Sequence, residues 1–486
     1  ILQKESISAT MNILVVMYVL SRMSVAYGLA MTVPFVISLF TGEGGAPALA
    51  CGAVISICIG SVMGHVSKNS VDTLTVQEGI AITALSWIMA TFLGMIPYVI
   101  GGYLGILDGV VECISGLSGT GATVIPDVTV LPESILLWRS MTHWLGGLGI
   151  IVIFIALFPQ FGKGIMHMLD AESTGPTSDR MVPRIKTMAK ALFTVYLVLT
   201  ALASAAYMWC GMDALTAVDH AMSTIATGGF STYNGSVAHF HNPVLEGWVI
   251  FFMGLSSANF SLYVVAWKRG ITAVFRDREF QVFCLIVLVS ALLMTANLVG
   301  MGLERGEAFR QALFQAASIS SSTGFVSADF DQWPSFCKAI LLFLMFCGGC
   351  AGSTAGGLKT TRLILLFKSL HLVVKQKILP HGVMAVRSNG EVYGEDIITG
   401  VMRFFAFYLF LDLTWDGVPL LDALGLSIST MGSCGPAFGI VGATCTYADL
   451  PVFSKCVVAI SMLMGRLEIY PVLALLMPSF WRRFNW

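Results

Sequence analysis

The sequence predicts an all-α integral membrane protein in which one helical unit occurs four times after two N-terminal spans. The first observation is composition: apolar residues make up 56% of the 486 residues and charged residues only 11%, whereas a soluble domain carries roughly 25% charged residues. The second is a series of long apolar runs. The third is a polar loop with a glycine that recurs at matching places between those runs.

Long apolar runs mark the expected spans, because a helix that crosses a bilayer needs about 20 consecutive apolar residues. The first ten residues look unlike a native start and are left out of the fold prediction, with Met11 as a candidate first residue. Residues are expected to be missing near 414–415, where Trp415 follows a short run abruptly. The ten expected spans lie near 12–40, 45–64, 77–101, 133–158, 187–211, 243–267, 280–301, 333–371, 397–414 and 452–480.

Four shorter apolar stretches lie between spans, near 108–119, 213–226, 306–322 and 418–433. Each is too short to cross about 30 Å of hydrocarbon. Each ends in a small polar loop, and the four loops read SGTGATV, IATGGFS, SSTGFVS and GSCGPAF. We align them on Thr120-Gly121, Thr227-Gly228, Thr323-Gly324 and Cys434-Gly435.

A unit of span, short helix, Gly loop and span therefore repeats about every 100 residues. It divides the chain into an N-terminal two-helix region, 1–76, and four pore repeats. The repeats are expected at 77–158, 159–267, 268–372 and 373–486, and the third ends in a broken helix.

Charge is distributed unevenly between the two ends of the spans, although the net charge is only −1 and predicts no attraction to nucleic acid. Acids surround the short helices, opposed only by Arg305 and Arg310, whereas the other loops and the C-terminus are basic. The positive-inside rule puts the basic loops and both termini in the cytoplasm and the Gly loops near the outer face. The acids are Asp108, Glu112, Asp127, Glu133, Asp213, Asp219, Glu246, Glu304, Glu307, Asp329, Asp331, Asp416, Asp422 and Asp449. The bases are Lys163, Arg180, Arg184, Lys186, Lys190, Lys268, Arg269, Arg276, Arg278, Lys359, Arg362, Lys368, Lys375, Lys377, Arg387, Arg482 and Arg483.

Non-helical backbone at membrane depth is tolerated only where it is buried in protein or lines a watery path. Four Gly loops around one axis can point carbonyls inward and replace the hydration shell of a cation, as in a potassium filter. Glycine suits such a loop because a Cβ resists the backbone angles required. The carbonyl ends of the short helices add negative potential. One such loop would be explained as a re-entrant turn or a helix cap, but four at matching positions favour a pseudo-fourfold, potassium-channel-like pore.

The segments TGATVIPDV, WRSMTHWLGGLGIIV, TGGFSTYN, SSTGFVSADF and GGCAGSTAGGLKTTR resemble the superfamily of potassium transporters that includes TrkH, KtrB and the plant HKT proteins. The resemblance is nearest to bacterial TrkH-type transporters and covers nearly the whole chain. It implies gated potassium uptake across the bacterial inner membrane and no enzymatic activity. It also implies a homodimer in lipid with a TrkA-like cytoplasmic nucleotide-binding subunit, and no organic cofactor in this chain.

The resemblance also assigns the site. Potassium is expected to bind the backbone carbonyls of Thr120, Thr227, Thr323 and Cys434. In related plant proteins a serine at the first filter glycine accompanies sodium preference, so Gly121 implies preference for potassium. The fourth loop departs most from the pattern, with Cys434-Gly435-Pro436, although a Gly-Pro pair is usual there in TrkH-like chains. The full filter set is Thr120, Gly121, Ala122, Thr227, Gly228, Gly229, Thr323, Gly324, Phe325, Cys434, Gly435 and Pro436.

The segment GGCAGSTAGGLKTTR lies inside the run 333–371, which is too long for one straight span, and its glycines do not favour a helix. We expect helix, loop and helix, with the loop under the Gly loops, and the resemblance makes that loop a gate. Close helix packing through small residues is an alternative. A phosphate-binding loop is disfavoured because Leu358 interrupts the motif and no strand precedes it. The gate residues are Gly348, Gly349, Gly352, Gly356, Gly357, Lys359 and Arg466.

Arg466 lies near the centre of the last span, where a charge costs several kcal/mol and usually serves function. Glu468 is two residues away and does not share its helix face. The resemblance implies that Arg466 projects into the pore as an electrostatic barrier, with Lys359 adding to it. A structural salt bridge within the bundle is the alternative.

Other candidate sites carry weaker signals. A sodium- or proton-coupled symporter of K⁺ or another small solute is the main alternative function, although such folds usually show inverted repeats. A membrane-embedded hydrolase would need a third member beside Asp219 and His220. The pair Cys347 and Cys350 lacks a partner motif for metal binding, and so does the loop pair His239 and His241.

Overall fold

The computed structural model describes residues 11–68, 75–147, 149, 185–270, 272–378, 386–388, 391–393, 420–467 and 469–481. These residues form helices, as predicted, apart from one hairpin and short 3₁₀ turns. The hairpin pairs β1 (Val386–Ser388) with β2 (Glu391–Tyr393). The 3₁₀ turns are Val128–Val130, Ser236–Phe240, Phe330–Gln332, Gly439–Val441, Tyr447–Asp449 and Pro478–Trp481.

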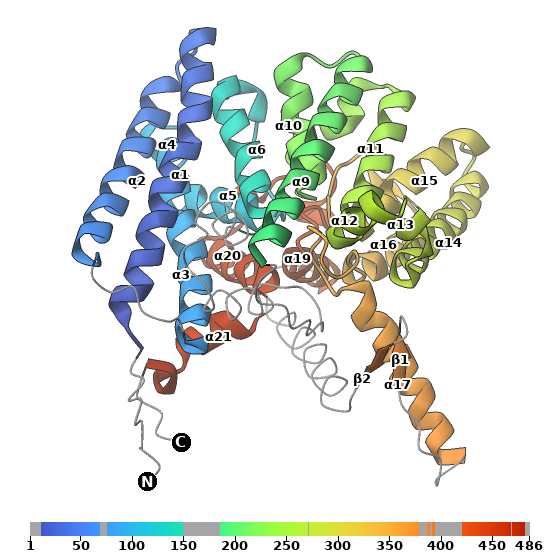
Figure 1. Ribbon diagram of the computed structural model, residues 1–486. Coiled ribbons are helices and arrows are strands. Elements are labelled where there is room, and N and C mark those ends of the chain that lie inside the picture. Colours follow the sequence, from blue (N-terminus) through green and yellow to red (C-terminus); the bar gives the residue numbers. More distant parts are fainter. Residues whose placement is uncertain are drawn as a thin grey trace, which may run out of the picture.

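Two long N-terminal helices, α1 (Ile13–Thr41) and α2 (Ala46–Val66), pack against each other at one side of the molecule (Figure 1). Small residues bring their backbones close. A Cβ on Gly28 would lie 2.8 Å from Cγ1 of Ile57, and one on Gly60 would lie 2.6 Å from the carbonyl oxygen of Ser21. These are the two spans that the sequence placed outside the repeats.

The remaining helices follow the predicted order of span, short helix, loop and span. In the fourth repeat the expected span 397–414 and Trp415 lie outside the described residues. The first three repeats contain α3 (Val76–Gly94), α4 (Ile96–Ile100), α5 (Ile106–Ser118) and α6 (Glu133–Gly147); α9 (Ile185–Trp209), α10 (Ala214–Ile225), α11 (Pro243–Ser256) and α12 (Phe260–Arg269); and α13 (Thr272–Arg276), α14 (Arg278–Gly300), α15 (Arg305–Ser320), α16 (Ser335–Phe346) and α17 (Thr360–Ile378). The fourth contains α19 (Leu420–Gly432), α20 (Val452–Arg466) and α21 (Tyr470–Leu476).

The repeats pack in a closed circle. Each helix that follows a Gly loop contacts the short helix of the next repeat: α6 contacts α10, α11 contacts α15, α16 contacts α19, and α20 returns to α5. Ion pairs join two of these contacts, Arg310 to Glu246 at 3.1 Å and Lys455 to Asp108 at 2.7 Å. In Figure 1 the red helices α19 and α20 accordingly lie between the blue N-terminal helices and the yellow helices of the third repeat.

Among the described residues, five helices are long and apolar enough to cross a membrane, or six if one bent pair counts as a span. The bent pair corrects the prediction of a straight span at 243–267, because α11 and α12 meet at 90°. Two contacts hold the bend. The Asn259 side chain accepts from Ser261 N at 2.9 Å, and Phe260 N donates to the Gly352 carbonyl at 3.0 Å.

The run 333–371 breaks as predicted, since α16 ends at Phe346 and α17 begins at Thr360. The expected single span at 452–480 also breaks, which the sequence analysis did not predict. Helix α20 ends at Arg466, Ile469 has a φ of 69°, and Pro471 sits in the first turn of α21. Helix α17 projects away from the body of the molecule (Figure 1).

Candidate functional site

The four Gly loops share one backbone hydrogen-bond pattern. In each loop one N–H reaches back five residues to a serine carbonyl, over 2.8 to 3.0 Å. The residues before and after that N–H both have positive φ. The donors and acceptors are Thr120 to Ser115, Gly228 to Ser223, Thr323 to Ser318 and Cys434 to Ser429. We call the residues 119–121, 227–229, 322–324 and 433–435 loops 1 to 4.

This pattern corrects the alignment of loop 2 by one residue. The sequence pairs Gly228 with Gly121, but the backbone pairs Gly229 with Gly121, since both have positive φ and follow the bonded N–H. The carbonyl equivalent to that of Thr120 is therefore that of Gly228 and not that of Thr227. The two consecutive glycines made the register ambiguous, whereas a serine five residues earlier marks it in all four repeats.

The four loops meet in a ring, and each glycine backs onto the next loop. A Cβ on Gly121 would collide with the carbonyl oxygen of Gly228, and one on Gly229 with that of Thr323. The same holds for Gly324 with Cys434, and for Gly435 with Thr120, which closes the circle. Glycine is required at these positions by its positive φ and by this close approach.

Residues just after the loops tie neighbouring repeats together. Asn234 accepts from Val128 N at 2.9 Å, and Val326 N donates to the Ser236 hydroxyl at 3.2 Å. Asp331 accepts from Gly439 N at 2.9 Å. The Tyr447 N–H closes the circle by donating to the carbonyl of Thr123 at 2.8 Å.

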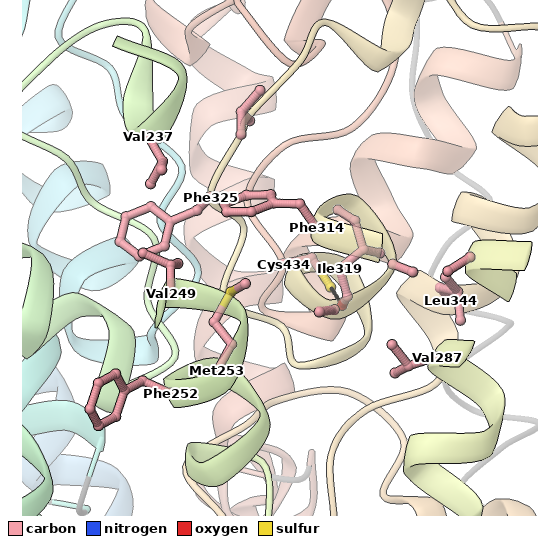
Figure 2. Close-up of a cluster of buried hydrophobic side chains, with 14 of the residues drawn as sticks. Val237, Val249, Phe252, Met253, Val287, Phe314, Ile319, Phe325, Leu344 and Cys434 are labelled. Carbon is pink, nitrogen blue, oxygen red and sulfur yellow. Dashed lines mark hydrogen bonds between the residues drawn. The ribbon is translucent and has the colours of Figure 1, made fainter. Parts of the chain in front are cut away.

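Side chains of the ring residues point into the protein behind the loops. The Thr120 and Thr323 hydroxyls lie 2.7 Å from those of Ser118 and Ser321, and Cys434 Sγ lies 3.5 Å from the carbonyl oxygen of Ile319. Figure 2 shows the Phe325 ring between Val237 and Val249 of the second repeat, in a cluster of buried apolar side chains. The backbone is thus the part of the loops left to face the ring axis.

Loop 4 differs from the others in one contact. The Tyr447 hydroxyl donates to the carbonyl of Gly435 at 2.6 Å. The Ser429 hydroxyl donates to the carbonyl of Pro436 at 3.0 Å, as Ser318 does to Phe325 at 2.6 Å in loop 3. The loop whose sequence differs most from the other three is therefore also the loop in which one carbonyl, that of Gly435, is already hydrogen-bonded to a side chain.

Three of the acids that surround the short helices in the sequence are buried inside the protein. The exposed fraction is 0% for Glu112, 3% for Asp219 and 5% for Glu246. Glu112 pairs with Arg139, a residue that the sequence analysis did not single out, at 2.5 Å. Asp127, Glu304 and Glu307 are exposed as expected.

The loop 348–362, whose last three residues form the first turn of α17, packs against loops 3 and 4 and the end of α10. Gly356 N donates to the Ser322 hydroxyl at 2.6 Å, and a Cβ on Gly356 would lie 2.6 Å from Cβ of Ser433. The Thr354 hydroxyl donates to the Ile225 carbonyl at 3.0 Å. Glu279 anchors the loop from below, accepting from Ala351 N and Thr361 N at 2.8 Å each.

Arg466 joins this loop to the first repeat. Its guanidinium donates to the Thr354 carbonyl at 2.8 Å, and to the Gly146 and Gly147 carbonyls at the end of α6 at 2.6 and 3.0 Å. Its guanidinium carbon lies 5.7 Å from the centre of the Trp87 ring. Lys359 is buried and donates to the Ala355 carbonyl within the loop.

The weaker sequence candidates fare differently. The phosphate-loop interpretation is wrong, because the glycines follow helix α16 and not a strand. His220 Nδ1 lies 2.8 Å from the Thr216 carbonyl, so no carboxylate completes a triad there. The His239 ring stacks on Tyr233. In the described part of the chain, no three His, Cys, Asp or Glu side chains are arranged to hold a metal ion.

Comparison with known proteins agrees with this architecture. The family model for TrkH, a cation transport protein, matches residues 45–483. The chain belongs to the TrkH family. The Trk system potassium uptake protein TrkH of Halomonas elongata is 34% identical over 97% of this chain and 100% of its own length. The Escherichia coli K12 protein of the same name is 33% identical over 93% of this chain and 96% of its own.

A solved structure of the same family matches the fold. The crystal structure of the potassium transporter TrkH from Vibrio parahaemolyticus superposes with a TM-score of 0.87 at 30% identity. The match covers 97% of this chain and 100% of that one. The chain is therefore a multi-pass membrane protein of this transporter family.

Proposed function

We propose that this protein takes up potassium ions across the bacterial inner membrane through a gated, channel-like pore, with both termini in the cytoplasm. The observation that carries the proposal is the closed ring of four Gly loops with one backbone geometry. Relatives of similar length that are named potassium uptake proteins support the choice of ion.

The peptide oxygens of the ring replace the water molecules that a cation loses when it enters. In register, the carbonyls are those of Thr120, Gly228, Thr323 and Cys434. The C-terminal ends of α5, α10, α15 and α19 all lead into the ring, so their partial negative charges add to its attraction for a cation. Exposed acids such as Asp127 and Glu307 would raise the local cation concentration outside.

The loop 348–362 and Arg466 form the gate in this proposal. An arginine cation under a carbonyl ring opposes the passage of a second cation, and its hydrogen bonds hold the loop to the end of α6. Because this chain offers no nucleotide-binding motif, gating by nucleotide would come from a TrkA-like cytoplasmic subunit. We further propose that the protein is a homodimer.

The test is ⁸⁶Rb⁺ uptake into liposomes that contain only this chain, in competition with K⁺ and with Na⁺. We expect K⁺ to compete far better than Na⁺, and uptake to need no proton or sodium gradient. A strict requirement for either gradient would replace the channel-like pore by coupled symport. Absence of ⁸⁶Rb⁺ uptake both with and without the partner subunit would refute potassium transport.

A further inference from the structure

One position recurs behind the ring with a different chemistry in each repeat. It lies three residues before the serine that accepts the loop N–H, on each short helix. Its occupants are Glu112, His220, Gln315 and Leu426, and all four are at most 1% exposed. The residue eleven positions later, just beyond each loop, is Thr123, Ser231, Val326 or Ala437.

In the first repeat this position holds the loop firmly. Both carboxylate oxygens of Glu112 lie 3.1 Å from the Thr123 hydroxyl, and Oε2 also accepts from Val124 N at 2.9 Å. Oε1 accepts from Arg139 Nε at 2.5 Å. The carboxylate is thus fully partnered, which a buried charge requires.

Arg139 carries the contact across to the second repeat. Its Nη1 donates to the Ser231 carbonyl at 3.0 Å, and its guanidinium carbon lies 3.5 Å from the centre of the Phe230 ring. His220 Nδ1 faces the Thr216 carbonyl and must carry the proton, so Nε2 accepts from the Ser231 hydroxyl at 3.0 Å. One chain of contacts therefore links the backbones that leave loops 1 and 2.

The third and fourth repeats lack this connection directly behind the loops, and are joined further along the chain, where Asp331 accepts from Gly439 N at 2.9 Å. Val326 and Ala437 offer no polar side chain to the position behind them. Neither end of the Gln315 amide has a hydrogen-bond partner among the described residues, and Leu426 is apolar. Loops 3 and 4 are held instead by the serine hydroxyls of Ser318 and Ser429.

We propose that Glu112 and Arg139 are a positioning pair that fixes the spacing of loops 1 and 2 and thereby sets the ion discrimination of the ring. The inference rests on the proposed function. A ring whose oxygens resist moving inward favours K⁺ over the smaller Na⁺, and charge-assisted hydrogen bonds resist such movement most strongly. Loops 1 and 2 form the stiff half of the ring, and loops 3 and 4 the compliant half.

The decisive variants remove the pair, a hydroxyl bonded to Glu112, or the hydroxyl bonded to His220 at the far end of the chain of contacts. Glu112→Gln/Arg139→Gln removes both charges together and so leaves no unpaired buried ion. Thr123→Val and Ser231→Ala each remove one hydroxyl at nearly constant volume. The matched control is Asp108→Asn/Lys455→Gln, which neutralises another ion pair of helix α5 that does not touch a loop. Folding is checked by size-exclusion chromatography.

The readout is the ratio of Na⁺ to K⁺ concentrations that halve ⁸⁶Rb⁺ uptake in liposomes, because this ratio does not depend on the amount of folded protein. We expect it to fall about fivefold in the double variant and about twofold in Thr123→Val and Ser231→Ala, in proportion to the hydrogen bonds removed. The control should keep the ratio of the unmodified protein. If the double variant does not fold, Thr123→Val decides for the pair, because Ser231→Ala leaves in place the Ser231 carbonyl that Arg139 binds.

An unchanged ratio in all folded variants of the pair overturns the inference. Gly121→Ser in the same assay separates this failure from failure of the proposed function. A lowered ratio in Gly121→Ser, with an unchanged ratio in the variants of the pair, leaves the filter in place and removes only the role of Glu112 and Arg139. An unchanged ratio in Gly121→Ser as well removes the filter itself.

Discussion

Loops 1 and 4 have the same backbone but different surroundings. Behind loop 1 lies a buried ion pair, Glu112 with Arg139. Behind loop 4 lie the apolar Leu426 and a tyrosine hydroxyl that is already bonded to a ring carbonyl. From below, Gly356 packs on loop 4, whereas the first repeat is reached through Arg466. Equal geometry is therefore maintained by unequal means, and the two halves of the ring should respond differently to substitution.

The largest expected effect comes from the glycine of loop 1. In Gly121→Ser the added Cβ would displace the Gly228 carbonyl. We expect the preference for K⁺ over Na⁺ to fall about tenfold, equivalent to about 1.4 kcal/mol of relative affinity. Competition of ⁸⁶Rb⁺ uptake by Na⁺ measures it. The control is Gly254→Ser, where nothing lies within 4 Å of the new Cβ, and an equal loss in the control would contradict the explanation.

The next effect concerns how the gate is held to the first repeat. Arg466→Ala removes the three carbonyl contacts that join the 348–362 loop to α6. We expect ⁸⁶Rb⁺ uptake without the partner subunit to rise about fivefold, because the loop loses its charged hydrogen bonds to α6. Initial rates in liposomes test this. Normal or reduced uptake by a folded variant would show that Arg466 is not the barrier.

A smaller effect is expected where the gate is anchored from below. Glu279→Gln keeps the shape of the side chain but replaces charge-assisted bonds to Ala351 N and Thr361 N by neutral ones, which are roughly half as strong. We expect uptake without the partner to rise about threefold. Arg278→Gln, at an exposed site beside Glu279 on α14, is the control. Equal rates in the two variants would exclude an anchoring role.

The smallest effect tests the peculiarity of loop 4. Tyr447→Phe removes the hydroxyl bonded to the Gly435 carbonyl, which contributes about 0.5–1.5 kcal/mol. Without this bond loop 4 should yield more easily, and the ratio of Na⁺ to K⁺ concentrations that halve uptake should fall about twofold. A change larger than that of Gly121→Ser would reverse the comparison and make loop 4 the dominant part of the ring.

The repeat, the short helices and the broken segment 333–371 could be predicted because each depends on local composition. Glycine and hydroxyl residues after a short apolar stretch are visible in a window of a few residues. The bend at Asn259 could not be predicted, since the apolar run continues across it. The N–H of Phe260 is taken by the Gly352 carbonyl, 92 positions later in the chain.

The site residues divide in the same way. Arg466 was recognised because a lone charge in an apolar run is conspicuous. The burial of Glu112 cannot be predicted from its neighbours in the sequence. Only the fold brings Arg139 to it from another helix and buries both side chains. The register of loop 2 against the other loops cannot be read from the loop sequence alone, because Gly228 and Gly229 are both glycines. The two residues differ in φ, which is positive at Gly229 and not at Gly228.

Because all four quarters belong to one polypeptide, a substitution alters a single quarter of the circle. In an assembly of four identical subunits the same change would strike every quarter at once. The contacts from Gly121 to Gly228 and onward to Thr120 mean that a local alteration is felt first by two neighbours. Each substitution in such a chain therefore changes ion preference by a small amount during evolution. In a symmetric tetramer each substitution changes all four quarters and so has a larger effect.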